Sequence, residues 1–188
     1  MRVLHDLRDH VPDGVTTAAT IGVFDGVHLG HQHVLRVLRA RAAEREAASA
    51  VVTFDVHPAL VLRPENAPKL LTTLDQRLEL LEAQGVDYVY LVHFDEARSA
   101  TQPEEFVRQA FVDALAACVV VVGADFHFGQ GRSGNLDSLS GLGEKYGFDV
   151  VGLELMSSDA DSAEPVSSTA VRRALAGGDV RAAASMLG

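Results

Sequence analysis

Five apolar segments of the chain have the length and composition of buried β-strands. They are rich in valine, phenylalanine and tyrosine and contain few charges, which favours strands covered on both faces. The predicted strands are Thr20–Phe24, Ala50–Phe54, Tyr88–Phe94, Val119–Gly123 and Asp149–Leu155. Between them lie amphipathic stretches in which apolar residues recur at helical spacing. The predicted helices are Leu29–Ala47, Thr73–Gln84, Pro103–Ala117 and Asn135–Tyr146.

This alternation of strands and helices predicts an α/β fold. Parallel neighbouring strands need a long crossover, so we expect a doubly wound, five-stranded parallel sheet with helices on both faces. Such sheets bind ligands beyond the carboxyl ends of their strands. The loops expected at that edge are Asp25–Gly30, Asp55–Pro58, Gly123–Gly134 and the segment that leads to Ser167.

The remaining segments are short or polar. Asp55–Pro68 contains three prolines and predicts a loop, and the acidic segment Met156–Val166 predicts a mobile connection. Two short helices, Ser168–Ala176 and Asp179–Leu187, are expected to follow. The sequence shows no internal repeat, so residues 1–188 are expected to form a single domain.

Composition narrows the class of protein. With 188 residues, 47% of them hydrophobic, the chain can bury a sizeable core. It has no apolar run of membrane-spanning length, no signal peptide and a single cysteine, Cys118, which together favour the cytoplasm and no membrane partner. The net charge of −10 argues against general nucleic-acid binding. Any site for anionic ligands must therefore concentrate positive charge locally.

The stretch Thr20–His33, TIGVFDGVHLGHQH, is the strongest chemical signal. It predicts a strand, a tight turn and the start of a helix, where His28 and His31 lie three residues apart on one face. Gly30 between them leaves the backbone open to a ligand, and free N–H groups at a helix start favour phosphate. Alternatively, the two histidines only cap the helix or pack nearby.

The H-x-G-H pattern in this stretch resembles the signature of the nucleotidylyltransferase superfamily. The longer form G-V-F-D-G-V-H-L-G-H resembles the FAD synthetase (FMN adenylyltransferase) module of prokaryotic bifunctional riboflavin kinase/FAD synthetases. This resemblance implies a Rossmann-like nucleotidylyltransferase fold and catalytic roles for His28 and His31. It also implies ATP-binding roles within the motif, although Asp25 could simply form the turn. The implied ATP-binding residues are Gly22, Phe24, Asp25, Gly26 and Gly30.

A second motif, Val166–Arg172, places three hydroxyls at a predicted helix start and an arginine one turn later. Hydroxyls, free N–H groups and a guanidinium all bind phosphate, although a serine cap and a solvated arginine would look the same. The motif resembles the I/V-S-S-T-x-x-R segment with which the superfamily holds the triphosphate. The resemblance implies that Ser167, Ser168 and Thr169 bind ATP and that Arg172 is catalytic.

Two further segments are similar to flavin-binding segments of the same family. Thr53–Pro58 resembles T-F-D-P-H-P, with Val56 in place of a proline, and Val122–Gly134 resembles G-x-D/N-F-x-F-G. Alternatively, His57 is only a polar residue of its loop, and Phe126 and Phe128 fill the core beneath theirs. The flavin-binding residues implied by the resemblance are Phe54, His57, Pro58, Asp125, Phe126 and Phe128.

The activity implied by the resemblance is FMN + ATP → FAD + pyrophosphate. The substrates ATP and FMN would be accompanied by Mg²⁺, held mainly by substrate phosphates rather than by protein ligands. Pantetheine phosphate or nicotinamide mononucleotide as the acceptor, and a non-catalytic flavin or nucleotide carrier, are the alternatives. The resemblance covers about Thr16 to Gly188, where the family continues into a riboflavin kinase domain. We expect a truncated chain whose full-length form is fused to that domain, with a natural stand-alone enzyme as the alternative.

Overall fold

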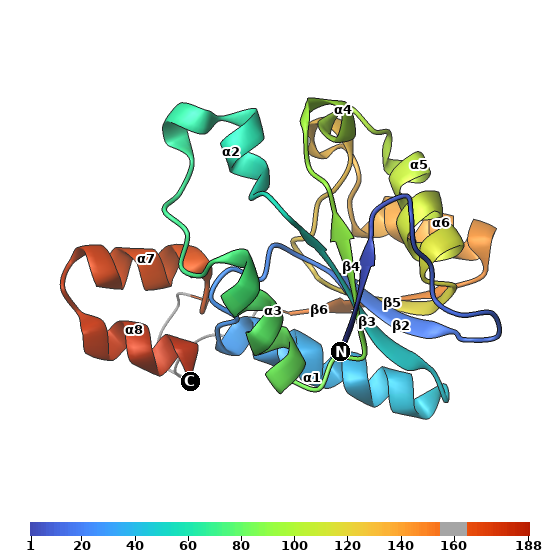
Figure 1. Cartoon of the computed structure of the whole chain (residues 1–188), viewed down its shortest axis with the longest axis horizontal. Helices are drawn as coiled ribbons and strands as arrows, with labels where there is room; N and C mark the ends of the chain where they lie inside the picture. Colours follow the sequence, from blue (N-terminus) through green and yellow to red (C-terminus); the bar gives the residue numbers. More distant parts are fainter. Residues whose placement is uncertain (155–164) are drawn as a thin grey trace.

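The computed structural model describes residues 1–154 and 165–188, and its centre is a parallel β-sheet (Figure 1). The six strands run in the order β1-β4-β3-β2-β5-β6, and every neighbouring pair is parallel. Their bounds are β1 (Arg2–His5), β2 (Thr17–Ile21), β3 (Ala48–Phe54), β4 (Tyr88–Val92), β5 (Ala117–Gly123) and β6 (Asp149–Leu153). The predicted doubly wound α/β class is confirmed.

The predicted number of five strands is wrong, because β1 is a sixth strand at the edge of the sheet. This strand has only four residues, and Leu4 is the one fully buried among them. An edge strand that buries one face needs no continuous apolar run, so it lacks the signal by which the other five strands were predicted.

Helices cover both faces of the sheet. One face packs against α1 (Leu29–Glu44) and α3 (Leu74–Ala83), and the other against α6 (Leu136–Tyr146) and the helix formed by α5 (Pro103–Val107) and its π-helical continuation Arg108–Ala114. A hydrophobic core lies on each face of the sheet. Consecutive residues of β2 pack into opposite cores: Ala18 into the core on the α1 side and Ala19 into the core on the other side. The sheet is therefore buried on both sides, as its continuous apolar strands require.

Two short helices, α7 (Ser168–Ala176) and α8 (Val180–Leu187), confirm the predicted C-terminal pair. They lie together beside the first turn of α1, on the left of Figure 1. The Gln32 amide of α1 donates to the Leu187 carbonyl over 2.8 Å. This contact attaches the end of the chain to the helix that carries the histidine motif.

Some predicted boundaries are wrong. The stretch predicted as a proline-rich loop contains α2 (Pro58–Leu62) and a 3₁₀ turn at Pro64–Asn66, because proline is accepted in the first turn of a helix. Strand β2 ends at Ile21 rather than Phe24, which turns away from the sheet with φ of 53°. The predicted mobile segment lies mostly in residues 155–164, outside the described residues; Pro165 and Val166 are described.

Three further short helical segments lie in the connections. They are α4 (Glu96–Ser99) after β4, the π-helical segment that continues α5, and the 3₁₀ turn Gln130–Arg132 after β5. Within residues 1–154 and 165–188, no helix is long and apolar enough to cross a membrane.

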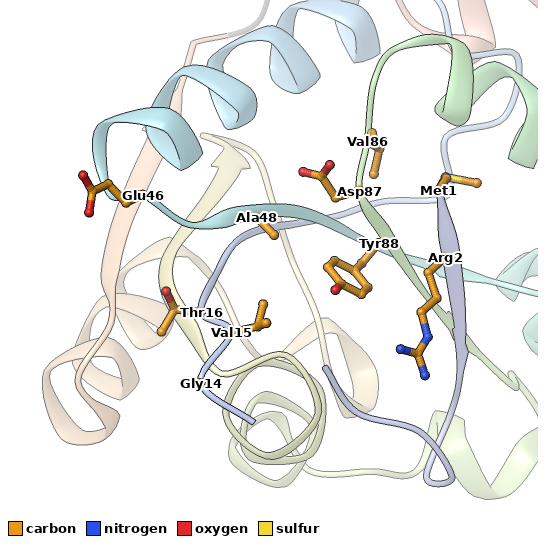
Figure 2. Close-up of a pocket in the computed structure, with 10 residues that line it drawn as sticks. All are labelled: Met1, Arg2, Gly14, Val15, Thr16, Glu46, Ala48, Val86, Asp87 and Tyr88. Carbon is orange, nitrogen blue, oxygen red and sulfur yellow. The ribbon is translucent and has the colours of Figure 1, made fainter. Parts of the chain in front are cut away.

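Different features lie at the two ends of the sheet. A cavity of about 650 Å³ opens at the amino ends of the strands, where Figure 2 shows Arg2, Ala48 and Tyr88 among its lining residues. All the predicted site loops leave the opposite, carboxyl ends. There the chain passes from β2 to β3 on one side, while β5 lies on the other side of β2. This reversal of strand order is the place where doubly wound sheets bind ligands.

Candidate functional site at the carboxyl ends of the strands

Asp25 is the centre of the site and is only 3% exposed. Its carboxylate accepts hydrogen bonds of 3.0 Å from the Leu71 and Thr72 backbone N–H groups and from the Thr72 hydroxyl, and it is ion-paired with Arg172. Burial by itself would raise the pKa of Asp25, but these N–H donors, the hydroxyl and the guanidinium outweigh it and lower the pKa. The carboxylate is therefore ionised, and both of its oxygens already have hydrogen-bond or ion-pair partners. A residue that only formed the turn would not need these partners.

The two predicted phosphate motifs meet around this carboxylate, although 140 or so residues separate them in the chain. The Ser168 hydroxyl donates to the Asp25 carbonyl over 2.9 Å, and a Cβ added to Gly30 would lie 3.0 Å from the Val166 carbonyl. Only glycine at position 30 lets the starts of α1 and α7 approach so closely. Arg172 also donates to the Lys69 carbonyl over 2.7 Å, so its guanidinium is held at the junction.

The hydroxyl residues of the second motif do not share one environment. Ser167 caps α7, because its side chain accepts from the Ala170 N–H over 3.1 Å. The Ser168 hydroxyl already donates its hydrogen bond to the Asp25 backbone carbonyl, whereas Thr169 is exposed. The serine-cap interpretation is thus correct for Ser167, but the solvated-arginine interpretation is wrong for Arg172.

His28 and His31 stack on one another at the start of α1, with ring centroids 3.7 Å apart. His28 is the N-cap residue: its Nδ1 accepts from the His31 N–H over 3.4 Å, which leaves the proton of the neutral ring on Nε2. Burial lowers the pKa of His28 to about 4, with a further contribution from Arg172. Both the capping and the shared face predicted from the sequence are therefore present.

The His31 ring lies between the rings of His28 and Phe24, and its centroid is 4.9 Å from that of Phe24. Burial, reinforced by a charge on His28, holds the pKa of His31 well below its usual value. Its buried Nδ1 has no hydrogen-bond partner among the described residues. Two neutral imidazoles beside a guanidinium form a site with hydrogen-bond donors and little negative charge, which suits an anionic ligand.

The Thr53–Pro58 segment lies at the neighbouring strand end. His57 caps α2 by accepting from the Ala59 N–H over 3.1 Å, and Pro58 is the first helical residue. Burial lowers the pKa of His57, and the charge of Arg172 lowers it further. Phe54 packs edge-on against Phe94, with centroids 5.4 Å apart. Val56 in place of proline leaves this capped helix intact.

The glycine-rich loop after β5 is closed on itself by paired backbone hydrogen bonds between Phe128 and Gly134. Phe128 is only 6% exposed and belongs to a hydrophobic core, whereas Phe126 is half-buried and stacks on it with centroids 5.3 Å apart. Asp125 is exposed. The core-plug alternative is therefore correct for Phe128, whose ring has no free face for a flavin. A flavin contact by Asp125 or Phe126 stays a prediction.

Two residues that hold the site together were not singled out from the sequence. Thr72 connects Asp25 to the Gly26 N–H, and Arg77 of α3 is 6% exposed and donates to the carbonyls of Val23 and Phe54. A signal for Arg77 existed in the sequence. It lies three residues after Leu74 and four before Leu81, on the apolar stripe of its helix, where a charge is unexpected.

Comparison with known proteins identifies the family. A family model described as FAD synthetase matches residues 12–170, which is most of the chain. The chain belongs to the FAD synthetase family. This match includes the histidine motif, both flavin-like segments and the start of α7, and it ends two residues before Arg172.

Curated relatives of the FAD synthetase family are longer than this chain. A bifunctional riboflavin kinase/FMN adenylyltransferase of Escherichia coli K12 is 36% identical over the whole chain, and one of Pseudomonas fluorescens is 40% identical. The chain spans 58% of the length of each. A solved structure described as a macrolide-efflux protein from Streptococcus pneumoniae superposes on the whole chain and 61% of its own, with a TM-score of 0.82 at 25% identity.

Proposed function

We propose that the chain is an FMN adenylyltransferase, which makes FAD and pyrophosphate from FMN and ATP. The observation that supports this most strongly is the junction of the two helix starts, where Arg172 is ion-paired with the buried Asp25 and His28 stacks on His31. The curated relatives carry the same activity in their names. Three fixed donors at one point are suited to a chain of phosphates.

In the proposed reaction, an FMN phosphate oxygen forms a bond to the α-phosphorus of ATP. The bond from that phosphorus to the oxygen bridging to the β-phosphorus breaks, and its electron pair leaves with pyrophosphate. The nucleophile comes from the substrate, so the protein supplies alignment and hydrogen bonds to the developing charge. The Nε2–H of His28, the His31 ring and the Arg172 guanidinium are the donors in this proposal, with the hydroxyls of Ser167 and Thr169 beside them.

The proposed ATP subsite is made of backbone as much as of side chains. Gly22, Gly26 and Gly30 keep the turn between β2 and α1 free of side chains, and Phe24 supports His31 from below. Asp25 acts by holding Arg172 rather than by touching a phosphate, because its oxygens are already occupied.

The proposed flavin subsite lies on either side of this junction. Phe54, His57 and Pro58 would flank the flavin from the end of β3, and Asp125 and Phe126 from the loop after β5. Phe128 would support Phe126 from beneath, since the two rings are stacked and Phe128 belongs to the core.

The residues present do not form a resident magnesium site. No group of three or more His, Cys, Asp or Glu side chains that could hold a metal occurs in residues 1–154 and 165–188. Asp25, the acidic residue at the junction, is already bound to Arg172 and to Leu71 and Thr72. We therefore propose that Mg²⁺ arrives as part of the substrate MgATP, held by phosphate oxygens.

A product analysis tests the proposed function. Purified chain is incubated with MgATP and, separately, with FMN, pantetheine phosphate, nicotinamide mononucleotide or riboflavin, and the products are identified by chromatography. We expect FAD from FMN only, and no FMN from riboflavin, because the matched region corresponds to the FAD synthetase model. Adenylylation of another acceptor would replace the proposed substrate, and binding of FMN and ATP without any product would indicate a carrier.

The position of the chain within a longer protein is part of the proposal. We infer that residues 1–188 are the adenylyltransferase domain and that the rest of each relative's length contains its riboflavin kinase. Use of ATP also supports the cytoplasm as the place of action.

A further inference from the structure

Arg77 is a buried cation directly beneath the proposed active site. It lies on α3, where Leu81 one turn later is in the core, and only 6% of its surface is exposed. The two terminal nitrogens of the guanidinium donate to different loops: one to the Val23 carbonyl over 2.7 Å, the other to the Phe54 carbonyl over 2.8 Å.

Burial of this charge is costly, and packing alone does not explain it. The Arg77 hydrogen bonds go to neutral carbonyl oxygens, and its buried Nε has no partner among the residues that the structure describes. Taking an ion out of water costs several kcal/mol unless its partners compensate. Burial accordingly lowers the pKa of the guanidinium, against the opposing charges of Asp25 and Asp55.

The two carbonyls belong to the loops that carry the two halves of the site. Val23 precedes the turn that leads to Asp25 and His28, and Phe54 ends β3 just before His57. The Thr53 hydroxyl also donates to the Val23 carbonyl, over 3.1 Å. The planar guanidinium thus spans the exits of two adjacent strands and fixes their separation, a geometry that a single ammonium group reproduces only in part.

We propose that Arg77 is a positioning residue that aligns the ATP-binding loop with the flavin-binding loop for transfer. The kinetic effect that we expect rests on the proposed function. The structural coupling of the two loops by Arg77 does not depend on that function. Each loop retains its own ligand contacts when Arg77 is replaced, so the binding of ATP alone and of FMN alone should change little. Their mutual alignment should suffer, and that alignment determines the rate of transfer.

The kinetic test compares Arg77→Met, Arg77→Lys and Leu81→Ala with the unmodified chain at a temperature at which all are folded. We expect Arg77→Met to lower kcat by about tenfold or more, with each ligand's Kd within about threefold. Arg77→Lys should recover part of the loss. Leu81→Ala destabilises the same helix but removes no hydrogen bond to either loop, so its kcat per folded molecule should stay within about twofold. A folded Arg77→Met with normal kcat, or an equal loss in Leu81→Ala, would overturn the proposal.

Hydrogen–deuterium exchange provides a readout that does not depend on activity. In Arg77→Met, or in Arg77→Lys if the first variant does not fold, amides of residues 22–28 and 54–57 should both exchange faster than in the unmodified chain. In Leu81→Ala the increase should centre on α3. Unchanged exchange in both loops would refute the positioning role. If the unmodified chain makes no FAD, the proposed function fails, and the exchange result still decides whether Arg77 couples the loops.

Discussion

At the scale of single residues, the site depends on one buried carboxylate that serves other protein groups. Asp25 joins Arg172, which comes from the far end of the chain, to the Leu71–Thr72 backbone. Its partners are a guanidinium, two backbone N–H groups and a hydroxyl. Each of them lowers the pKa of the carboxyl, against the effect of burial. A residue of this kind stabilises the fold and holds the proposed catalytic cation at the same time.

Replacement of Asp25 by asparagine should therefore cost stability as well as activity. Breaking a buried ion pair typically destabilises a protein by about 3–5 kcal/mol, because the other charge is left without its partner. We expect Asp25→Asn to lower the free energy of unfolding in urea by about that amount. Asp149→Asn is the matched control: it breaks the exposed pair with Arg45, which is worth about 1 kcal/mol or less. Equal effects of the two variants would contradict the central role of Asp25.

The two histidines are predicted to act chiefly in the transition state. Loss of one preorganised donor typically costs about a hundredfold to a thousandfold in rate. We expect His28→Ala and His31→Ala each to lower kcat at least about tenfold while circular dichroism shows a folded chain. Because the two rings stack on one another and in the proposed reaction act on one phosphate chain, the double variant should lose less than the product of the two single losses.

His28 also caps α1, so its structural and catalytic contributions must be separated. Asparagine is a good N-cap residue, and His28→Asn should retain the stability that His28→Ala loses, about 1 kcal/mol. Its kcat should remain low, because the imidazole Nε2–H is gone. Near-normal turnover in folded His28→Ala and His31→Ala would contradict the nucleotidylyltransferase interpretation.

At the scale of elements, helix starts and strand exits are the parts from which the site is made. The start of α1 meets the start of α7 at Gly30 and Val166, and α3 contributes Arg77 to the exits of β2 and β3. The loop after β5 is different, because Phe128 and Gly134 pair across it, while Ala124 bonds to Leu153 and Gln130 to Thr101. The Phe128 ring packs into the core beneath this loop.

Two substitutions in this loop should affect different properties, one the stability of the fold and the other the binding of FMN. Phe128→Ala removes a buried ring and should lower the free energy of unfolding by about 3–5 kcal/mol. Asp125→Ala changes an exposed side chain and should leave stability within about 0.5 kcal/mol, while it weakens FMN binding more than ATP binding. Urea unfolding and calorimetric titration with each ligand measure the two effects. Equal losses of FMN and ATP affinity in Asp125→Ala would mean that this residue does not recognise the flavin.

At the scale of the whole molecule, a chain with a net charge of −10 would bind its proposed substrate anions at a site of neutral imidazoles and buried guanidinium groups. Arg172 is ion-paired with Asp25, and Arg77 lies in the field of Asp25 and Asp55, so these carboxylates offset the two guanidinium charges. The proposed site therefore lacks the excess of negative charge that the chain carries as a whole. It also places titratable groups where their protonation would oppose folding.

The free energy of unfolding should consequently fall as the pH is lowered from 6.5 to 4. His28 has its pKa lowered by burial to about 4, so within this range the unfolded chain takes up a proton that the folded chain does not. His28 alone should account for about 2 kcal/mol between pH 7 and pH 4.5, and His31 should add to it in the same direction. His93, whose pKa is raised by its exposed contact with Asp55, acts in the opposite direction.

Urea unfolding at pH 7 and at pH 4.5, with His28→Asn as the comparison, measures this change in the free energy of unfolding. The variant lacks the titrating ring but keeps a capping side chain, so its stability should depend less steeply on pH. An equally steep dependence in both proteins would show that His28 is not the titrating group.

The sequence by itself determined the elements and the chemistry that they carry. Continuous apolar strands and amphipathic helices specify local structure through side-chain periodicity, so five strands and the helices between them were predictable, whereas the one-sided edge strand β1 was not. The histidine motif and the S-S-T-x-x-R segment were also readable, because a helix start and its capping residues are local features. The resemblance of these motifs to one family agreed with the family match.

The tertiary structure alone decided which residues meet. Nothing local to Asp25 indicates that it would hold Arg172, 147 positions away, or that Thr72 would complete its shell. Whether Phe126 or Phe128 fills the core depends on what lies beneath the loop, and the partners of Arg77 are carbonyls on two other loops. Long-range contacts are set by the order of strands in the sheet and by the packing of helices against it. That order brings the ends of β2, β3 and β5 together, and the site is made there.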